Sequence, residues 1–210
     1  MRNWPYFFTK FVCWLLFRLR FGLKVRGQEH VPKRGAFVLA SNHVSFLDPP
    51  LMGAACPRRL RFMARADLFA KTLLGTFLRL VRVIPLKRGE ADLAAVREAL
   101  ALLRQGEPIA IFPEGGRQLS GRLGVAKRGV GLLAEAASVP IIPVYVKGTF
   151  EALPPSAPRL QRAKIRVAFG PPISYTTTSL KGKPPSHRRH EQLAAVVTEA
   201  WCRLEAQLEA

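Results

Sequence analysis

From residue 35 onward, short apolar runs alternate with longer amphipathic stretches. A run of about four to eight apolar residues, bounded by glycine, proline or charged positions, is typical of a buried strand. Six such runs predict strands, at residues 36–40, 60–64, 81–86, 108–112, 140–146 and 164–169. Strands that alternate with helices predict a single layered α/β domain, with a mostly parallel central sheet flanked by helices.

The stretches between these runs have helical spacing. They predict helices at residues 67–80, 90–105 and 126–137, and an amphipathic helix closes the chain. Apolar residues three or four apart form the expected buried stripe of the second helix: Leu93, Val96, Leu100 and Leu103. The stripe of the closing helix is Leu193, Val196, Val197, Trp201, Leu204 and Leu208. Two polar or proline-bearing segments, 150–163 and 176–189, are expected to be loops.

The first 21 residues have a different pattern, because rings and cations alternate there. Five large apolar residues recur at helical spacing and would share one face: Phe7, Phe8, Phe11, Trp14 and Leu15. Lys10 and Arg18 interrupt the apolar runs, so the segment is too short to span a bilayer, which needs about 20 apolar residues. Rings on one face with cations at its margins predict a helix that lies in the membrane interface. The alternative is a terminal helix that packs its rings into the core. We divide the chain into an interfacial helical segment, 1–30, and one domain, 31–210.

Charge narrows the possible partners. The chain has 33 Lys and Arg against 14 Asp and Glu, a formal net charge of +19. Such an excess implies an anionic partner, whether nucleic acid, an acidic protein, a phosphorylated substrate or an anionic membrane. The three cysteines are too few and too far apart to predict a disulfide framework or a zinc site.

The stretch SNHVSFLDPP, residues 41–50, follows the first predicted strand of the domain and contains candidate chemistry. His43 and Asp48 are five residues apart, which is the wrong spacing for one helix face. A turn can bring the two together, and a histidine paired with a carboxylate is a candidate general base with its orienting group. Alternatively, His43 is a strand-end residue and Asp48 is the N-cap of a helix that begins at Pro49.

Three further stretches follow predicted strands or contain one. VIPLKRG places Arg88 just after a strand, and IFPEGGRQ places Glu114 and Arg117 just after the next. The Gly115-Gly116 pair permits a tight turn with exposed backbone amides, and the planar guanidinium of Arg117 suits a phosphate. The third stretch is VPIIPVYV, which begins at residue 139.

Together these four stretches resemble the blocks of the glycerolipid acyltransferase family, specifically its 1-acylglycerol-3-phosphate (lysophosphatidate) acyltransferases. The resemblance covers residues 42–144, about half of the chain. The family blocks read here as Asn42-His43 with Asp48, Ile84-Pro85-Leu86-Lys87-Arg88, Phe112-Pro113-Glu114-Gly115-Gly116-Arg117-Gln118, and Val139-Pro140-Ile141-Ile142-Pro143-Val144. Two positions depart from the family pattern: Gly116 stands where threonine is usual, and Gln118 where serine is usual.

The resemblance implies that residues 31–210 form an acyltransferase domain. It would transfer a fatty acyl group from acyl-CoA or acyl carrier protein to the free hydroxyl of 1-acylglycerol-3-phosphate, giving phosphatidate, without a cofactor or metal. His43 would act as the base and Asp48 as its orienting group. The acceptor would be bound by Arg88, Glu114, Gly115, Gly116 and Arg117. Within this set, Glu114 would bind acceptor hydroxyls or orient Arg117. We expect this chemistry at an anionic membrane, on the cytoplasmic face, with the protein bound peripherally or monotopically and no nucleic acid involved.

Other readings of the sequence remain open. The acceptor could be another lysolipid, such as a lysophospholipid or a lyso-ornithine lipid. From other classes of protein, a basic nucleic-acid-binding protein or a non-catalytic membrane-binding scaffold would also carry the positive charge. Against these, the aromatics cluster at one terminus rather than on a nucleic-acid-binding sheet, and a scaffold has no need of His43, Asp48, Glu114 and Arg117 together.

Overall fold

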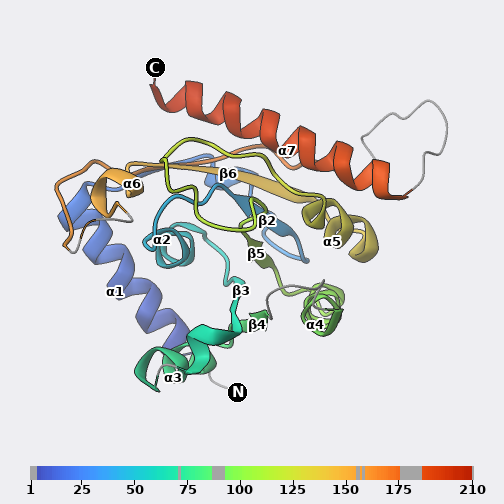
Figure 1. Ribbon diagram of the computed structural model, residues 1–210, viewed down its shortest axis with the longest axis horizontal. Coiled ribbons are helices and arrows are strands. Elements are labelled where there is room, and N and C mark those ends of the chain that lie inside the picture. The colour runs from blue at the N-terminus through green and yellow to red at the C-terminus, as the bar shows by residue number, and fades with distance from the viewer. Residues whose placement is uncertain are drawn as a thin grey trace.

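The computed structural model describes residues 4–70, 72–86, 93–154, 157, 159–175 and 186–209. Its centre is a seven-stranded sheet with helices on both faces (Figure 1). The strand order is β1-β7-β6-β2-β5-β3-β4. The strands are β1 Lys24–Arg26, β2 Val38–Ser41, β3 Arg61–Arg65, β4 Ile84–Leu86, β5 Ile109–Ile111, β6 Ile141–Lys147 and β7 Arg166–Phe169.

The sheet is mostly parallel, so the predicted fold class is confirmed. Strands β6, β2, β5, β3 and β4 all run in one direction. Strand β7 is antiparallel to β6, and β1 is parallel to β7. The carboxyl ends of five strands and the starts of β1 and β7 therefore share one edge of the sheet. Strand β1 was not predicted, and it lies in the sheet although it precedes residue 31.

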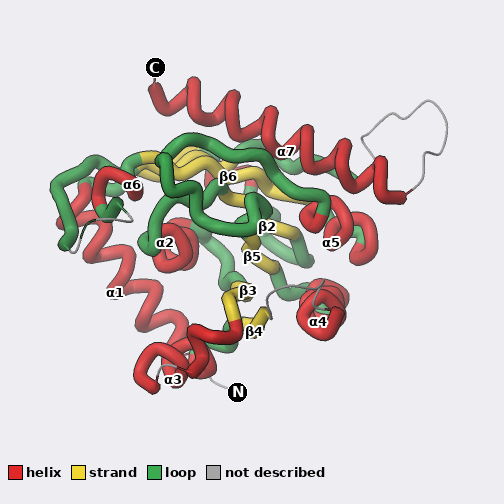
Figure 2. The backbone as a smooth tube through the Cα atoms, in the orientation of Figure 1, coloured by secondary structure: helices red, strands yellow, loops and turns green. Residues whose placement is uncertain are grey.

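The helices form two layers (Figure 2). They are α1 Trp4–Phe21, α2 Asp48–Ala55, α3 Thr72–Leu80, α4 Leu93–Arg104, α5 Gly129–Ala137, α6 Thr149–Ala152 and α7 Ser186–Glu209. Alternate residues of β2 point to opposite faces, as in any strand. Leu39 packs in a core with α1 and α2, whereas Val38 and Ala40 pack in a second core with α4, α5 and α7. Central strand β2 is thus buried on both faces, which explains its uninterrupted apolar sequence.

The predicted stripe of the closing helix is confirmed. Five of its six members are buried in α7, and Val196 is half-buried. The indole Nε1 of Trp201 also donates a hydrogen bond to the carbonyl of Ala40, at 3.0 Å. This bond ties α7 to the carboxyl end of β2. The helix begins at Ser186, so the end of the predicted loop 176–189 is helical, while residues 176–185 lie outside the described part.

Two predicted helices differ from the structure. The stretch 67–80 divides into a short 3-10 helix, Ala66–Ala70, followed by α3. In α4 the predicted stripe is wrong at Leu93, which is 62% exposed. The buried face of α4 is Ala95, Ala99 and Leu103, because small alanines four residues apart allow the helix to approach its neighbours closely.

Helix α1 packs through one stripe and exposes the other. Tyr6, Phe17 and Phe21 are buried, and the hydroxyl of Tyr6 accepts a hydrogen bond from the N–H of Leu60 at 3.0 Å. The predicted outer rings are exposed by 43–59%: Phe7, Phe8, Phe11 and Trp14. The alternative in which these rings pack into the core is therefore wrong. Within the described residues, no helix combines the length and the hydropathy needed to cross a membrane.

Candidate active site

His43 and Asp48 meet on the turn between β2 and α2. Asp48 is fully buried, and its Oδ2 lies 2.8 Å from Nδ1 of His43. The same oxygen accepts hydrogen bonds from the backbone N–H groups of Val44 and Ser45, each at 2.8 Å. Two backbone N–H groups and Nδ1 of His43 thus converge on one carboxylate oxygen, which fixes both the turn and the imidazole.

The predicted helix-capping role of Asp48 is wrong. Helix α2 begins at Asp48 itself, and Leu47 occupies the N-cap position without a side-chain cap. The carboxylate instead points back along the chain toward the amides of the turn. The first residue of α2 therefore holds the preceding turn through its side chain, which the spacing of His43 and Asp48 does not reveal.

The imidazole of His43 is held on its face as well as at Nδ1. Its ring stacks on Phe112, with centroids 4.2 Å apart and planes inclined by 26°. The side chain is 16% exposed, and Nε2 makes no hydrogen bond to any described residue. One nitrogen is therefore occupied by the carboxylate while the other is available to exchange a proton with a substrate.

Asn42 anchors this turn to the neighbouring strand. Its Oδ1 accepts from the N–H of Val146 at 2.8 Å, and its Nδ2 donates to the carbonyl of Val146 at 3.0 Å. The amide side chain thus replaces a strand partner beside β6. Sequence reasoning gave Asn42 no role of its own, although its place directly before His43 was visible.

Glu114 joins the loop after β5 to the His43 turn. Its Oε2 accepts from the N–H of His43 at 2.8 Å, and its Oε1 accepts from the N–H of Gly124 at 3.0 Å. Burial raises the pKa of this carboxyl, and the two backbone donors oppose that rise. The prediction that Glu114 binds acceptor hydroxyls or orients Arg117 stays a prediction. In the structure its two oxygens hold backbone amides.

Replacing Glu114 with glutamine should weaken the fold. The glutamine side chain has only one acceptor oxygen. Its NH₂ group would therefore face the backbone N–H of either His43 or Gly124, and that hydrogen bond would be lost. Loss of a buried charged hydrogen bond costs about 2 kcal/mol, which for a chain of this size lowers Tm by about 4–8 °C. Thermal unfolding followed by circular dichroism measures this, with Glu98→Gln on the exposed face of α4 as the matched control. An unchanged Tm in Glu114→Gln would show that the hydrogen bonds of Glu114 to His43 and Gly124 contribute nothing to stability.

The Gly115-Gly116 turn brings a lysine to the site that the sequence analysis did not consider. Gly115 has φ 79°, which favours glycine, and a Cβ there would lie 2.6 Å from Nζ of Lys127. The N–H of Lys127 donates to the carbonyl of Pro113 at 2.8 Å, which holds the lysine against the turn. Of the two glycine amides, that of Gly115 donates to Phe112, whereas that of Gly116 has no partner among the described residues.

Arg117 crosses from the same loop to the His43 turn. Its guanidinium carbon lies 3.5 Å from the ring centroid of Phe46, a cation–π contact on the residue between His43 and Asp48. The Nη1 atom of Arg117 is buried and has no hydrogen-bond partner in the described part of the chain. A buried guanidinium nitrogen without a partner suits an incoming anion.

Arg88, the remaining predicted acceptor residue, lies outside the described residues, as does Lys87. The strand before them, β4, ends at Leu86 on the edge of the sheet that also carries His43. Three steps separate β4 from β2 in the strand order, with β5 and β3 between them.

A family model described as Acyltransferase matches residues 22–147, more than half of the chain. The chain therefore belongs to the acyltransferase family. Among its relatives is a protein of Bacillus subtilis named 1-acyl-sn-glycerol-3-phosphate acyltransferase, 28% identical over 161 residues, covering 76% of this chain and 77% of that protein. A probable enzyme of the same name from Mycoplasma pneumoniae is 33% identical, over 70% of this chain and 59% of its own.

A solved structure agrees with these matches. The crystal structure of the 1-acyl-sn-glycerophosphate acyltransferase of Thermotoga maritima superimposes with a TM-score of 0.79 at 26% identity. The match covers 98% of this chain and 78% of that one. The whole described architecture, helix α1 included, is thus similar to that of an acyltransferase.

Proposed function

We propose that this protein transfers a fatty acyl group from an acyl thioester to the free hydroxyl of 1-acylglycerol-3-phosphate, giving phosphatidate in phospholipid biosynthesis. The observation that carries the proposal is the oriented pair His43–Asp48, with Nε2 of His43 unpartnered. The relatives named above, which are acyltransferases for this acceptor, support it.

In the proposed mechanism one nitrogen of His43 carries the proton at rest. Because Oδ2 of Asp48 already accepts two backbone N–H groups, it acts toward His43 as an acceptor, and Nδ1 carries the hydrogen. The lone pair on Nε2 then takes the proton of the acceptor hydroxyl as its oxygen attacks the thioester carbonyl carbon. The carbon–sulfur bond breaks, and the departing thiolate receives that proton from Nε2. Buried Asp48 stabilises the imidazolium between these steps.

No covalent enzyme intermediate is required, because a thioester is already activated. Two side chains that could act as nucleophiles, Cys56 and Ser45, are poorly suited to it. Burial raises the pKa of the Cys56 thiol to about 11, so it is neutral at physiological pH. Buried Ser45 donates its hydroxyl to the carbonyl of Leu153 at 3.0 Å. The acyl group therefore passes directly from donor to acceptor.

The acceptor phosphate would be bound beside the Gly115-Gly116 turn. Arg117 supplies an unpartnered Nη1, Lys127 supplies an ammonium group, and Gly116 supplies a free backbone N–H. Two cations suit a phosphate monoester, which carries about −1.5 to −2 charges at neutral pH. Lysophosphatidate presents such a monoester, whereas a lysophospholipid with a larger headgroup presents a diester.

Gly116 favours one further candidate, a lysophospholipid acceptor. A Cβ at Gly116 would meet no atom within 4 Å, so the position where the family usually has threonine is open space. That space could admit a headgroup beyond the phosphate.

A matrix of acceptors and donors tests the proposal. Purified protein in lipid vesicles would be given lysophosphatidate, lysophosphatidylethanolamine or a lyso-ornithine lipid, each with acyl-CoA or acyl carrier protein as donor. The proposal expects the highest kcat/KM for lysophosphatidate. A preference for lysophosphatidylethanolamine, a phosphodiester, would assign the protein to the lysophospholipid acyltransferases. If no acceptor is acylated with either donor, the proposed acyltransferase activity is contradicted altogether.

We also propose that α1 binds the membrane surface through its outer rings. Rings exposed by 43–59% on a helix that also carries Arg18 and Arg20 are typical of the bilayer interface, whereas Lys10 donates to the carbonyl of Cys56 on the domain side. The opposite stripe fixes the helix to the domain, since Tyr6, Phe17 and Phe21 are buried. Such docking would bring the His43 site to lipid substrates.

Replacing Phe8, Phe11 and Trp14 with aspartate should release the protein from vesicles. Three exposed apolar side chains that would enter the bilayer interface become charged, so vesicle partitioning should fall at least about 100-fold. Activity on a water-soluble short-chain acceptor should be largely kept. Vesicle sedimentation measures the change, with a matched variant carrying three aspartates on exposed α4 positions Leu93, Ala94 and Ala101 as the control. Unchanged sedimentation of the α1 variant would contradict the proposed docking.

A further inference from the structure

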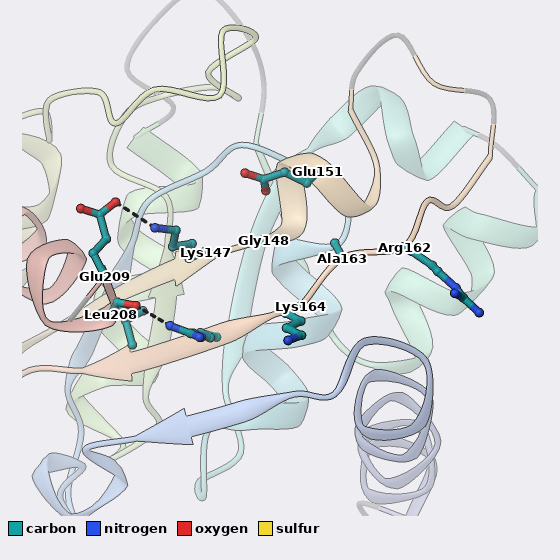
Figure 3. Close-up of a pocket in the computed structure, with 9 residues that line it drawn as sticks. Lys147, Gly148, Glu151, Arg162, Ala163, Lys164, Leu208 and Glu209 are labelled. Carbon is teal, nitrogen blue, oxygen red and sulfur yellow. Dashed lines mark hydrogen bonds and ion pairs between the residues drawn. The ribbon is translucent and has the colours of Figure 1, made fainter.

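A cavity lined by residues of β6, α6, β7 and α7 lies away from the His43 site. It has a volume of about 610 Å³ and lies where β6 ends and β7 begins (Figure 3). A second cavity of about 280 Å³ adjoins it, and the two share Lys164 and Arg166. We call the two together the basic groove. Its cations are Arg18, Lys24, Lys147, Arg162, Lys164 and Arg166, and its acids are Glu151 and Glu209.

Half of these cations already have partners within the protein. Lys147 forms an ion pair with Glu209 at 2.8 Å. Arg166 donates to the carbonyl of Leu208 at 2.6 Å, and Arg18 donates to the carbonyl of Leu23 at 3.2 Å. These contacts hold the walls of the groove together.

The other three cations are left uncompensated. Lys24, Arg162 and Lys164 are exposed, and none makes a hydrogen bond or ion pair with a described residue. Figure 3 shows Lys147 directed toward Glu209, whereas Arg162 and Lys164 point away from both acids. The groove therefore presents an unbalanced positive charge to its surroundings, which suits an anionic ligand.

The groove adjoins the end of α1, which indicates the kind of anion. Arg18 and Gly22 line it, and the apolar side chains of Leu16 and Leu19, next along the helix, are 59% and 76% exposed. Exposed leucines on a helix whose end borders a group of uncompensated cations are typical of a protein surface at the level of lipid headgroups. A soluble anion would need the cations but would have no use for the leucines.

We propose that the basic groove binds the phosphate headgroups of anionic membrane lipids while α1 contacts the acyl-chain boundary. This inference rests on the proposed docking of α1 and adds to it a dependence on lipid charge. The groove would bind the membrane surface next to the end of α1, and the protein would bind anionic membranes more tightly than neutral ones. Each cation near an anionic surface adds to binding, and the effect decays within a Debye length.

The test compares two triple variants that lose the same charge. The first is Lys24→Gln, Arg162→Gln and Lys164→Gln in the groove. The second is Arg97→Gln, Arg104→Gln and Arg188→Gln, at exposed positions of α4 and α7 that have no described partners. Sedimentation would be measured with vesicles of phosphatidylcholine alone and with vesicles containing phosphatidylglycerol. Thermal unfolding of both variants checks that they fold.

We expect the groove variant to bind phosphatidylglycerol vesicles about 100-fold more weakly than the native protein, with binding to neutral vesicles unchanged. The control variant should lose only a few-fold. Equal losses in both variants would show that overall charge, not the groove, is responsible. A loss on neutral vesicles as well, or a native level of binding in the groove variant, would overturn the proposal.

Two other results would show which part of the proposal is wrong. If the native protein binds neither kind of vesicle, the docking of α1 is wrong and the groove proposal fails with it. If the groove variant keeps vesicle binding but its KM for acyl-CoA rises, the groove holds the phosphates of the donor and the lipid assignment is wrong.

Discussion

His43→Ala should lower kcat by about 10²–10⁴-fold without unfolding the protein. The imidazole is oriented by Asp48 at 2.8 Å and by the ring of Phe112, and no second base stands in its place among the described contacts of the turn. Without it, the acceptor hydroxyl must lose its proton to water, and the leaving thiolate must gain one from water. Release of free thiol from acyl-CoA, followed spectroscopically, measures the rate.

His187→Ala is the matched control, because His187 is exposed on α7 and has no described partner. It should keep native turnover. Thermal unfolding of His43→Ala should stay close to native, since the bonds of Asp48 to Val44 and Ser45 remain. Near-native turnover in a folded His43→Ala protein would refute the proposed base.

Arg117→Ala should lower kcat/KM for lysophosphatidate by roughly 10–150-fold. The buried Nη1 of Arg117 has no partner, and a hydrogen bond between charged groups is worth about 1.5–3 kcal/mol. For a neutral monoacylglycerol the loss should be much smaller, because that acceptor has no phosphate. Steady-state kinetics on both acceptors measure the difference.

Arg122→Ala provides a control on the same loop, because the side chain of Arg122 is exposed and has no described partner. Its kinetics should match those of the native protein on both acceptors. Arg117 also stacks on Phe46, so a purely structural role is the competing explanation. Equal losses for Arg117→Ala on lysophosphatidate and monoacylglycerol would establish that structural role.

The sequence predicted the sheet well, because most of its strands are buried on both faces and read as uninterrupted apolar runs. Strand β1 escaped detection because Lys24–Arg26 has one apolar residue between two cations. It becomes a strand only by pairing with β7, which lies about 140 positions later in the chain. In this pairing Lys24 lies opposite Arg166. In α4, the leucine pattern suggested a stripe that included Leu93, but the alanines allow the closer packing.

The site shows the same division between local pattern and long-range contact. The spacing of His43 and Asp48 predicted a pair on a turn, and the structure has that pair. The positions of Lys127 and of Gly124, one of the two residues whose amides bind Glu114, depend on how the loop after β5 folds back over its own start. Residues ten or more apart in a loop have no periodicity that would relate them, so sequence reasoning had no signal for either contact.

Direct acyl transfer to lysophosphatidate is tested most directly by one labelling experiment. The protein would be incubated in vesicles with an acyl thioester labelled in its acyl chain, first alone and then with lysophosphatidate. We predict no label bound covalently to the protein in the first stage and labelled phosphatidate in the second. Label bound to the protein, above all at Cys56 or Ser45, that moves into lipid when the acceptor is added would contradict direct transfer. A second stage that yields no labelled phosphatidate would contradict lysophosphatidate as the acceptor.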